Sequence, residues 1–214
     1  MARYDRVRTL FGDDFDRLQN SKVILLGVGG VGGVCLDCLF RSGIKDITIV
    51  DFDTFEITNQ NRQLYSEFYL GNSKVKALKK HYKDITVIEQ YIDEKWVEEF
   101  DFTDYDLVLD AIDNTKAKIA LAKKCYKKLI SSFGSANKTD ASMVMVDNIW
   151  KSKGDKLGSK IRYELRKQKF DKNYKVIFST QQVDKSNMGS FMGVTATFGL
   201  MMCSEAVKKL LSTQ

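Results

Sequence analysis

A glycine-rich loop is the feature of this sequence best suited to hold a charged ligand. Gly27, Gly29, Gly30 and Gly32 fit the pattern G-x-G-x-x-G and close an apolar run that begins at residue 22. Such glycines permit a tight turn and let a phosphate approach backbone N–H groups at the start of a helix. Asp51 ends the next apolar run, where its carboxylate can accept hydrogen bonds from ribose hydroxyls. The pattern predicts a nucleotide site but does not separate NAD or FAD from ATP.

Three charged residues further along the chain favour ATP. Arg62 and Lys74 follow the second apolar run, and Asp113 follows a later one. ATP concentrates more phosphate charge than a dinucleotide, so cations at this edge of a sheet are electrostatically useful. Asp113 is placed to hold Mg²⁺ bridging those phosphates. Taken singly, an arginine or lysine of this kind is more often a solvated surface charge. Because the glycine loop is also present, we interpret Arg62 and Lys74 as phosphate-binding residues.

Strands and helices alternate around these residues. The sequence predicts strands at 22–27, 46–51, 86–90 and 105–111, and helices at 30–41, 73–82 and 115–128. This alternation is typical of βαβ units and predicts an α/β, Rossmann-like fold with a mainly parallel sheet flanked by helices. Additional strands at 141–149 and 175–180, a basic helix at 159–169 and a long helix at 189–211 are expected in the C-terminal half.

No linker, repeat or shift in composition divides the 214 residues. We therefore expect a single domain over 1–214, with a nucleotide-binding half at about 20–135 and a substrate-facing half at about 136–214. No apolar run reaches the roughly 18 residues of a membrane-spanning helix, so we expect no membrane segment. The first residues also lack the apolar stretch of a secretory signal, which predicts a cytoplasmic location.

Four cysteines leave a choice between packing and chemistry. Cys35 and Cys38 form a C-x-x-C inside a predicted helix, without a second C-x-x-C to complete a zinc site. Cys203 lies in an apolar stretch of the C-terminal helix. We expect these residues to pack as small apolar side chains.

The segment 151–175 carries most of the chain's positive charge. Its ten basic and three acidic residues give +7, against +6 for the whole chain. A segment of this kind can contact a phosphate backbone or form an ordinary solvated face. A second basic cluster, at Lys123, Lys124, Lys127 and Lys128, is expected to be a solvated face.

Five motifs together resemble a known superfamily. GVGGVGG, DFD, NQNRQ, GNSK and AIDN occur in the order and spacing of the adenylation domain of ubiquitin-activating-like enzymes. The resemblance implies ATP and Mg²⁺, with Asp51 at the ribose, Asn59, Arg62 and Lys74 at the phosphates and Asp113 at the metal. The implied ATP-binding set is Gly27, Gly29, Gly30, Gly32, Asp51, Asp53, Asn59, Arg62, Gln63, Lys74 and Asp113.

The opening residues carry a further part of this resemblance. Arg3 to Arg6 read R-Y-D-R, similar to the R-Y-x-R start of the superfamily. The resemblance implies a homodimer in which Arg6 reaches the ATP of the other subunit. Arg6, Arg62, Lys74 and Asp113 are thus the expected catalytic residues.

One branch of the superfamily is favoured by two later motifs. IRYELRK at 161–167 and VIFST at 176–180 resemble signatures of tRNA threonylcarbamoyladenosine dehydratases. The paired zinc-binding C-x-x-C motifs of the sulfur-carrier branch are missing, as is a cysteine at 181–190. The branch implies a tRNA substrate contacted by Lys160, Arg162, Arg166, Lys167 and Lys169, and it leaves open whether sulfur-relay proteins are partners.

The implied reaction is an ATP-dependent dehydration. The threonine carboxylate of the modified adenosine would form an acyl-adenylate, which a nucleophile of the same modification would close into a ring. Two alternatives remain at this point: an adenylyltransferase for a ubiquitin-like sulfur-carrier protein, and a non-catalytic NAD-binding regulator. Arg62, Lys74 and Asp113 together disfavour the regulator.

Overall fold

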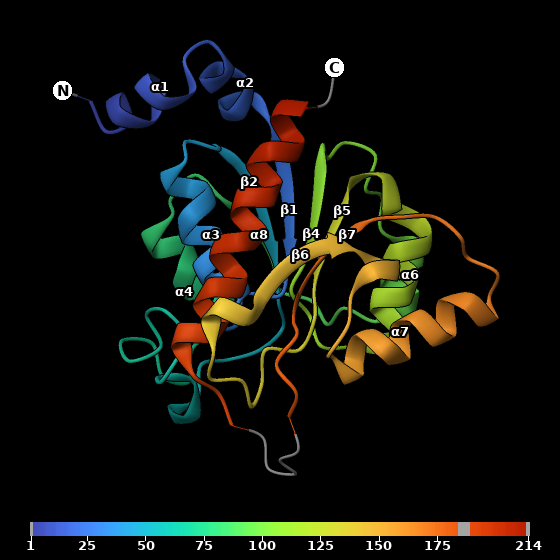
Figure 1. Cartoon of the computed structure of the whole chain (residues 1–214). Helices are drawn as coiled ribbons and strands as arrows, with labels where there is room; N and C mark the ends of the chain where they lie inside the picture. Colours follow the sequence, from blue (N-terminus) through green and yellow to red (C-terminus); the bar gives the residue numbers. More distant parts are fainter. Residues whose placement is uncertain (1, 184–188, 213–214) are drawn as a thin grey trace.

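The computed structural model describes residues 2–183 and 189–212, and one sheet runs through them (Figure 1). Its strand order is β3-β2-β1-β4-β5-β7-β6. The strands are β1 Lys22–Leu26, β2 Asp46–Val50, β3 Thr86–Ile88, β4 Leu107–Asp110, β5 Leu129–Ser132, β6 Val144–Asn148 and β7 Lys175–Ser179. All neighbouring pairs are parallel except β6 with β7, which is antiparallel. The predicted Rossmann-like, mainly parallel sheet is therefore confirmed.

Helices cover both faces of the sheet, which is why its central strands are apolar throughout. On β1, Leu25 belongs to one core and its neighbours Ile24 and Leu26 to the other. Helices α3 Gly32–Arg41, α4 Lys74–His81 and α8 Met192–Ser212 pack on the first face. Helices α5 Glu94–Glu99, α6 Thr115–Cys125 and α7 Lys156–Lys167 pack on the second.

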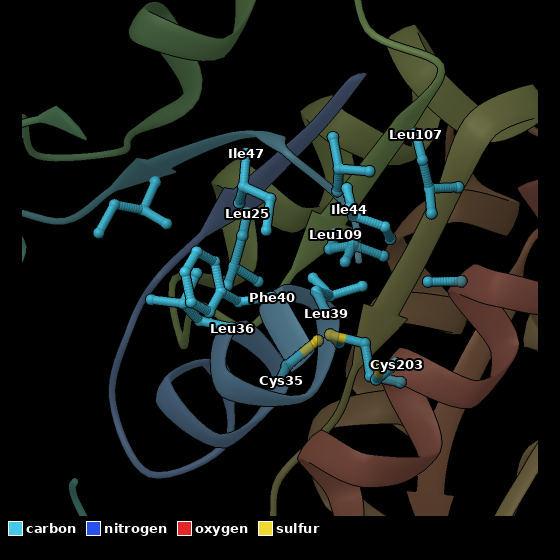
Figure 2. Close-up of a cluster of buried hydrophobic side chains, with 14 of the residues drawn as sticks. Leu25, Cys35, Leu36, Leu39, Phe40, Ile44, Ile47, Leu107, Leu109 and Cys203 are labelled. Atoms are coloured by element: carbon cyan, nitrogen blue, oxygen red, sulfur yellow. The ribbon is translucent and has the colours of Figure 1, made fainter. Parts of the chain in front are cut away.

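The first core joins α3 and α8 to the sheet (Figure 2). Side chains of α3 lie against those of the central strands, with Leu39 beneath Leu109, and Cys35 faces Cys203 of α8. A Cβ at Gly199 would lie only 2.5 Å from the Val31 carbonyl, so the glycine permits α8 to approach α3 closely. Cys35 and Cys203 are buried, as expected of packing cysteines, whereas Cys38 is half-buried.

The sequence did not predict several short elements. The helix expected at 115–128 ends at Cys125, passes through a 3₁₀ turn at Tyr126–Lys128 and continues into β5. The short helix α5 is capped by Asp93, whose carboxylate accepts the Trp96 N–H at 2.8 Å. Helices α1 Asp5–Phe11 and α2 Asp14–Asn20 precede β1 and were also missed. Each of these elements is too short to show a clear periodicity.

Three of the four lysines at 123–128 are exposed, as expected of a solvated face, and Lys128 is half-buried, but two of the four also bind backbone carbonyls. Lys124 Nζ donates to the carbonyls of Val97, Glu98 and Phe100, which end helix α5. Lys128 Nζ donates to the carbonyls of Phe102 and Tyr105, both at 2.7 Å. The ammonium groups thus bind backbone carbonyls at the end of a helix and in the following turn.

The carboxyl ends of β1 and β4 mark the point where strand order reverses. The chain leaves β1 towards β2 on one side and reaches β4 on the other. In open α/β sheets a crevice forms at this point and receives ligands. Among the described residues, no helix has both the length and the apolar character needed to cross a bilayer.

Candidate active site

A cleft of about 320 Å³ opens at the carboxyl ends of β1, β2 and β4. The loops after these strands supply most of its walls, together with segments at 59–63 and 190–195. The sequence-predicted residues that line it are Gly27, Gly29, Gly30, Asp51, Asp53, Asn59, Arg62, Gln63, Lys74 and Asp113. Residues from distant parts of the chain thus meet at one site, as the motifs predicted.

Two glycines fix the shape of the loop at the bottom of the cleft. Gly27 has φ +84°, and a Cβ there would lie 2.9 Å from the Ala111 carbonyl oxygen. A Cβ at Gly32 would overlap the carbonyl oxygen of Gly27. Gly32 belongs to the predicted ATP-binding set, but it is buried and does not line the cleft. Its contribution is to packing. It lets α3 begin directly against the loop.

The loop presents backbone donors to the cleft. In the described part of the chain, the N–H groups of Gly29, Gly30 and Val31 have no hydrogen-bond acceptor. They lie where α3 begins, and the partial positive charge of a helix N-terminus adds to their attraction for an anion. The geometry suits a phosphate group.

Asp51 is oriented by the backbone around it. Its Oδ2 accepts the Val28 N–H at 2.8 Å, and its Oδ1 accepts the Asp53 N–H at 2.9 Å. The residue is only 8% exposed, yet it lines the cleft. Each carboxylate oxygen has a second acceptor site, so the fixed group can still receive hydroxyl donors from a ligand.

Lys74 brings a buried positive charge to the cleft. Its residue exposure is 5%, and its Nζ lies 2.8 Å from Asp53 Oδ2. Asp53 is half-exposed, so one partner of the pair faces solvent. A buried ammonium is costly unless it is paired, and Asp53 supplies that pairing.

Arg62 covers the glycine loop from the side. Its Nη1 donates to Thr58 O and Asn61 Oδ1, both at 2.8 Å. A Cβ at Gly30 would lie 3.1 Å from Arg62 Cγ, which shows how closely the arginine stem lies over the loop. Asn59 supports the same segment, because its Oδ1 accepts the Glu56 N–H at 3.0 Å.

Gln63 holds a polar atom without a partner. It is 7% exposed, lines the cleft, and its Oε1 has no hydrogen-bond partner among the described residues. Leaving a buried amide oxygen unpaired costs about 1–3 kcal/mol. Such an atom beside a ligand cleft is therefore a candidate acceptor for a ligand donor.

Asp113 is the free carboxylate of the cleft. It is exposed, and no described residue forms a hydrogen bond or ion pair with it. No cluster of three or more metal-ligating side chains exists among the described residues. A single carboxylate beside a phosphate site fits Mg²⁺, which usually keeps several waters and binds one or two carboxylates together with substrate phosphates.

An aromatic pair forms a wall that the sequence analysis did not predict. Phe52 and Tyr91 pack edge to face with ring centroids 4.7 Å apart, and both line the cleft. Asn114 Nδ2 donates to the Tyr91 hydroxyl at 3.3 Å. Phe52 lies within the DFD motif and could have been inferred from it. Tyr91 follows a three-residue strand without any motif, so only the fold reveals it.

Arg6 lies outside the cleft of its own chain. It is exposed on α1, at the end of the molecule where β1 begins, whereas the glycine loop follows the end of β1 (Figure 1). Helix α1 buries none of its residues.

The five predicted tRNA-contacting residues lie on or just after α7. Lys160, Arg166, Lys167 and Lys169 are exposed, and Ile161 and Leu165 form the buried face as the spacing predicted. Arg162 is different, because it is half-buried and donates to the hydroxyls of Ser152 and Ser159. Desolvation lowers the pKa of Arg162, with the nearby Arg166 acting in the same direction.

The chain belongs to the ThiF family, whose model matches residues 4–214. It is 38% identical over 179 residues to the tRNA threonylcarbamoyladenosine dehydratase of Bacillus subtilis, covering 79% of this chain and 70% of that protein. It is 30% identical to the Haemophilus influenzae protein of the same name, and the match covers 99% of this chain and 97% of that protein. The fold matches the ATP complex of the Escherichia coli protein TcdA with a TM-score of 0.92 and 27% identity, covering 98% of this chain and 94% of that chain.

Proposed function

We propose that this protein catalyses the ATP-dependent dehydration of threonylcarbamoyladenosine in tRNA through an acyl-adenylate. The observation that carries the proposal is the cleft itself, where a phosphate-binding loop, Asp51, Arg62, Lys74 and Asp113 converge. Curated relatives of this activity match the chain over almost its whole length, and a solved relative binds ATP.

Asp51 and the glycine loop would hold the nucleotide. The Asp51 carboxylate, already fixed by two backbone N–H groups, would accept hydrogen bonds from the ribose hydroxyls. The free N–H groups at 29–31 would bind the phosphates. The edge-to-face pair of Phe52 and Tyr91 gives the cleft an aromatic wall.

Arg62 and Lys74 would stabilise the charge that develops at the phosphates. Both are positioned before ligand binds, Arg62 by its own segment and Lys74 by Asp53. Preorganised charges of this kind cost no reorganisation during the reaction. Asp113 would hold Mg²⁺, and the metal, when bound, would neutralise phosphate charge.

The chemistry would proceed in two bond exchanges. A carboxylate oxygen of the threonine attacks the α-phosphorus, and the bond from that phosphorus to the bridging oxygen of pyrophosphate breaks. A nucleophilic atom of the same modification then attacks the acyl carbon, and AMP leaves with the former carboxylate oxygen. The ring product has lost one water, whose elements are accounted for by cleavage of ATP to AMP and pyrophosphate. No described residue lining the cleft is a cysteine, and this route requires no protein nucleophile.

The basic side chains of and after α7 would bind the tRNA. Lys160, Arg166, Lys167 and Lys169 offer exposed charge for phosphates, whereas Arg162 would contribute after exchanging its serine contacts. We further propose that the metal is Mg²⁺ and that the location is cytoplasmic, the latter from the lack of a secretory apolar stretch among the first residues. Sulfur-relay proteins are possible partners only by the sequence resemblance.

We also propose that the active species is a homodimer. Arg6 is exposed on a helix that buries nothing and lies far from its own cleft, so a role at the phosphates requires the partner's site. An isologous dimer would complete both sites at once.

The main competing function is adenylation of a ubiquitin-like sulfur-carrier protein. The same cleft would serve that reaction, but the chain lacks the paired C-x-x-C motifs of that branch. Incubation with ATP and Mg²⁺, with threonylcarbamoylated tRNA in one arm and a carrier ending in Gly-Gly in the other, separates the two. We expect AMP and a nucleoside lighter by one water in the tRNA arm only. AMP in the carrier arm alone would refute the proposal.

A further inference from the structure

The outward side of α7 carries one continuous stripe of side chains. Lys156, Lys160, Tyr163 and Lys167 are spaced by four, three and four residues, which places them in line along a helix. All four are exposed, and the opposite face buries Gly158, Ile161 and Leu165. Tyr163 is therefore an aromatic ring in the middle of a lysine stripe.

Nothing in the described fold accounts for an aromatic residue at this position. The Tyr163 residue is 64% exposed, and no described residue makes a hydrogen bond, ring contact or cation–π contact with it. Trp150 nearby is different: its indole N–H donates to Lys172 O at 3.0 Å, and the Arg166 guanidinium lies over its ring. The face of the Tyr163 ring is therefore open to solvent and available to a ligand.

The stripe begins at the edge of the cleft. Asp155, which caps α7, is buried and lies against Gly134, where a Cβ would be 3.3 Å from Asp155 Oδ2. The next residue, Ser135, lines the cleft. Lys138 Nζ lies 3.7 Å from Asp155 Oδ2 with both side chains buried, and this pair ties the start of α7 to the loop beside the cleft.

From the cleft, α7 runs outward past the end of α6, with which it is in contact (Figure 1). Lys160 and Lys167 are seven residues apart, about 10 Å along the axis. A strand lying on the stripe would thus place phosphates near the two lysines with Tyr163 between them.

We propose that Tyr163 is a stacking platform for an unpaired base of the substrate RNA, with Lys156, Lys160 and Lys167 binding the adjacent phosphates. The inference rests on the proposed function, because it assigns a contact to the RNA substrate. Unpaired bases of RNA loops are commonly recognised by stacking on aromatic side chains, whereas paired duplex offers its phosphates and hydroxyls. Positive charge around the ring favours a polyanion over an apolar protein partner.

The test separates stacking from charge. Tyr163→Ala, Tyr163→Phe and Lys160→Ala are compared with wild type for binding to a hairpin RNA with an unpaired loop and to a blunt duplex of equal length, across a salt series. Tyr163→Ala should weaken hairpin binding by about five- to a hundredfold with little change in salt slope. Tyr163→Phe should retain most of the affinity because it keeps the ring. Lys160→Ala should instead lower the salt slope by roughly 0.7 to 0.9.

Duplex binding provides the internal control. It should respond to Lys160→Ala and not to Tyr163→Ala, and the melting temperature of Tyr163→Ala should stay within about 2 °C of wild type. Equal affinities of wild type and Tyr163→Ala for the hairpin would overturn the inference, as would an equal loss on hairpin and duplex. If one of these two binding results is found and the wild-type protein still dehydrates modified tRNA, the inference about Tyr163 fails and the proposed function stands. If wild type forms AMP only with a Gly-Gly carrier, the proposed function itself fails.

Discussion

At the scale of single residues, the site combines groups that are held in place with groups that are free. Asp51 and Lys74 have fixed partners, while Asp113 and Gln63 Oε1 have none among the described residues. The first kind can orient a nucleotide, and the second kind is available to the proposed metal or to donor groups of a ligand. Substitutions of the two kinds of residue should therefore differ in how much they change activity and stability.

Substitution of Arg62 or Asp113 should stop turnover and spare the fold. In the proposed mechanism, Arg62→Ala and Asp113→Ala each remove a charge that acts on the phosphates or their metal, and we expect AMP formation to fall about 10²–10³-fold. Asp113 is exposed and lacks a described partner, so unfolding of that variant should be unchanged within about 0.5 kcal/mol. Steady-state AMP release and urea unfolding check both statements. Near-normal turnover of either variant would refute the assigned role.

Cysteine reactivity offers a test that depends on pH. A hydrogen bond with Cys203 lowers the pKa of the Cys38 thiol, against the effect of its partial burial. Burial raises the pKa of Cys35 well above its usual value and raises that of Cys125 to about 11. The thiolate is the nucleophile, so below pH of about 9 Cys38 should hold the largest thiolate fraction.

Iodoacetamide labelling of the folded protein should therefore modify Cys38 first. Its rate should rise with pH and level off at a lower pH than the rate of Cys125, whose thiol has a pKa of about 11. Peptide mass spectrometry at several times and pH values measures each site, and Cys38→Ser should remove the fast phase. Labelling of Cys125 at the same rate as Cys38 would contradict this ordering.

At the scale of elements, the sequence predicted long periodic segments well and short ones poorly. Helix α7 was recognised because its apolar residues repeat at helical spacing, and the first strands because they are apolar throughout. Strand β5 has four residues and follows a helix and a 3₁₀ turn directly, so no local pattern separated it. Tyr91 was missed for a related reason, because its place in the cleft depends on how β3 and β4 are arranged in the sheet.

A buried ion pair connects β4, β5 and α6. Lys118 Nζ lies 2.9 Å from both Asp110 oxygens and donates to Ser132 O at 2.7 Å, and Ser131 Oγ donates to Asp110 at 2.6 Å. Both charged side chains are at most 1% exposed. Asp110 ends β4, three residues before Asp113, so the pair holds the strand end that carries the cleft loop.

Removing this lysine should cost much of the protein's stability. Lys118→Met leaves the Asp110 charge buried with fewer partners, and we expect a loss of about 3–5 kcal/mol in the free energy of unfolding. Lys116→Met, on the exposed side of the same helix, is the matched control and should change it by less than about 0.5 kcal/mol. Urea denaturation compares the two. Equal stability of both variants would show that the pair does not support the site.

At the scale of the whole molecule, one sheet brings distant motifs to a common edge, and in the proposed homodimer a second copy of the chain would supply Arg6 there. The sequence predicted the parallel sheet and hence the meeting of Asp51 and Asp113 at its carboxyl edge. It did not reveal the strand order or the antiparallel strand β6, because both depend on long-range pairing. The position of α1 is consistent with the proposed role of Arg6 in trans.

Mixing two inactive variants tests this proposal. Arg6→Ala and Asp113→Ala subunits should form mixed dimers in which one of the two sites is intact. After full exchange of equal amounts, about a quarter of the wild-type sites, and hence of AMP formation, should return. Native mass spectrometry confirms the exchange. No recovery in mixed dimers would show that Arg6 acts in its own chain or has no role.

The central claim is that the substrate's carboxylate attacks the α-phosphorus of ATP, and isotope transfer tests it most directly. Threonylcarbamoylated tRNA labelled with ¹⁸O in the threonine carboxylate is incubated with ATP, Mg²⁺ and the protein in unlabelled water. An acyl-adenylate passes one carboxylate oxygen to phosphorus, so the account predicts AMP containing one ¹⁸O and a ring product that retains the other. Unlabelled AMP, with both labels still in the nucleoside or lost to water, would contradict it.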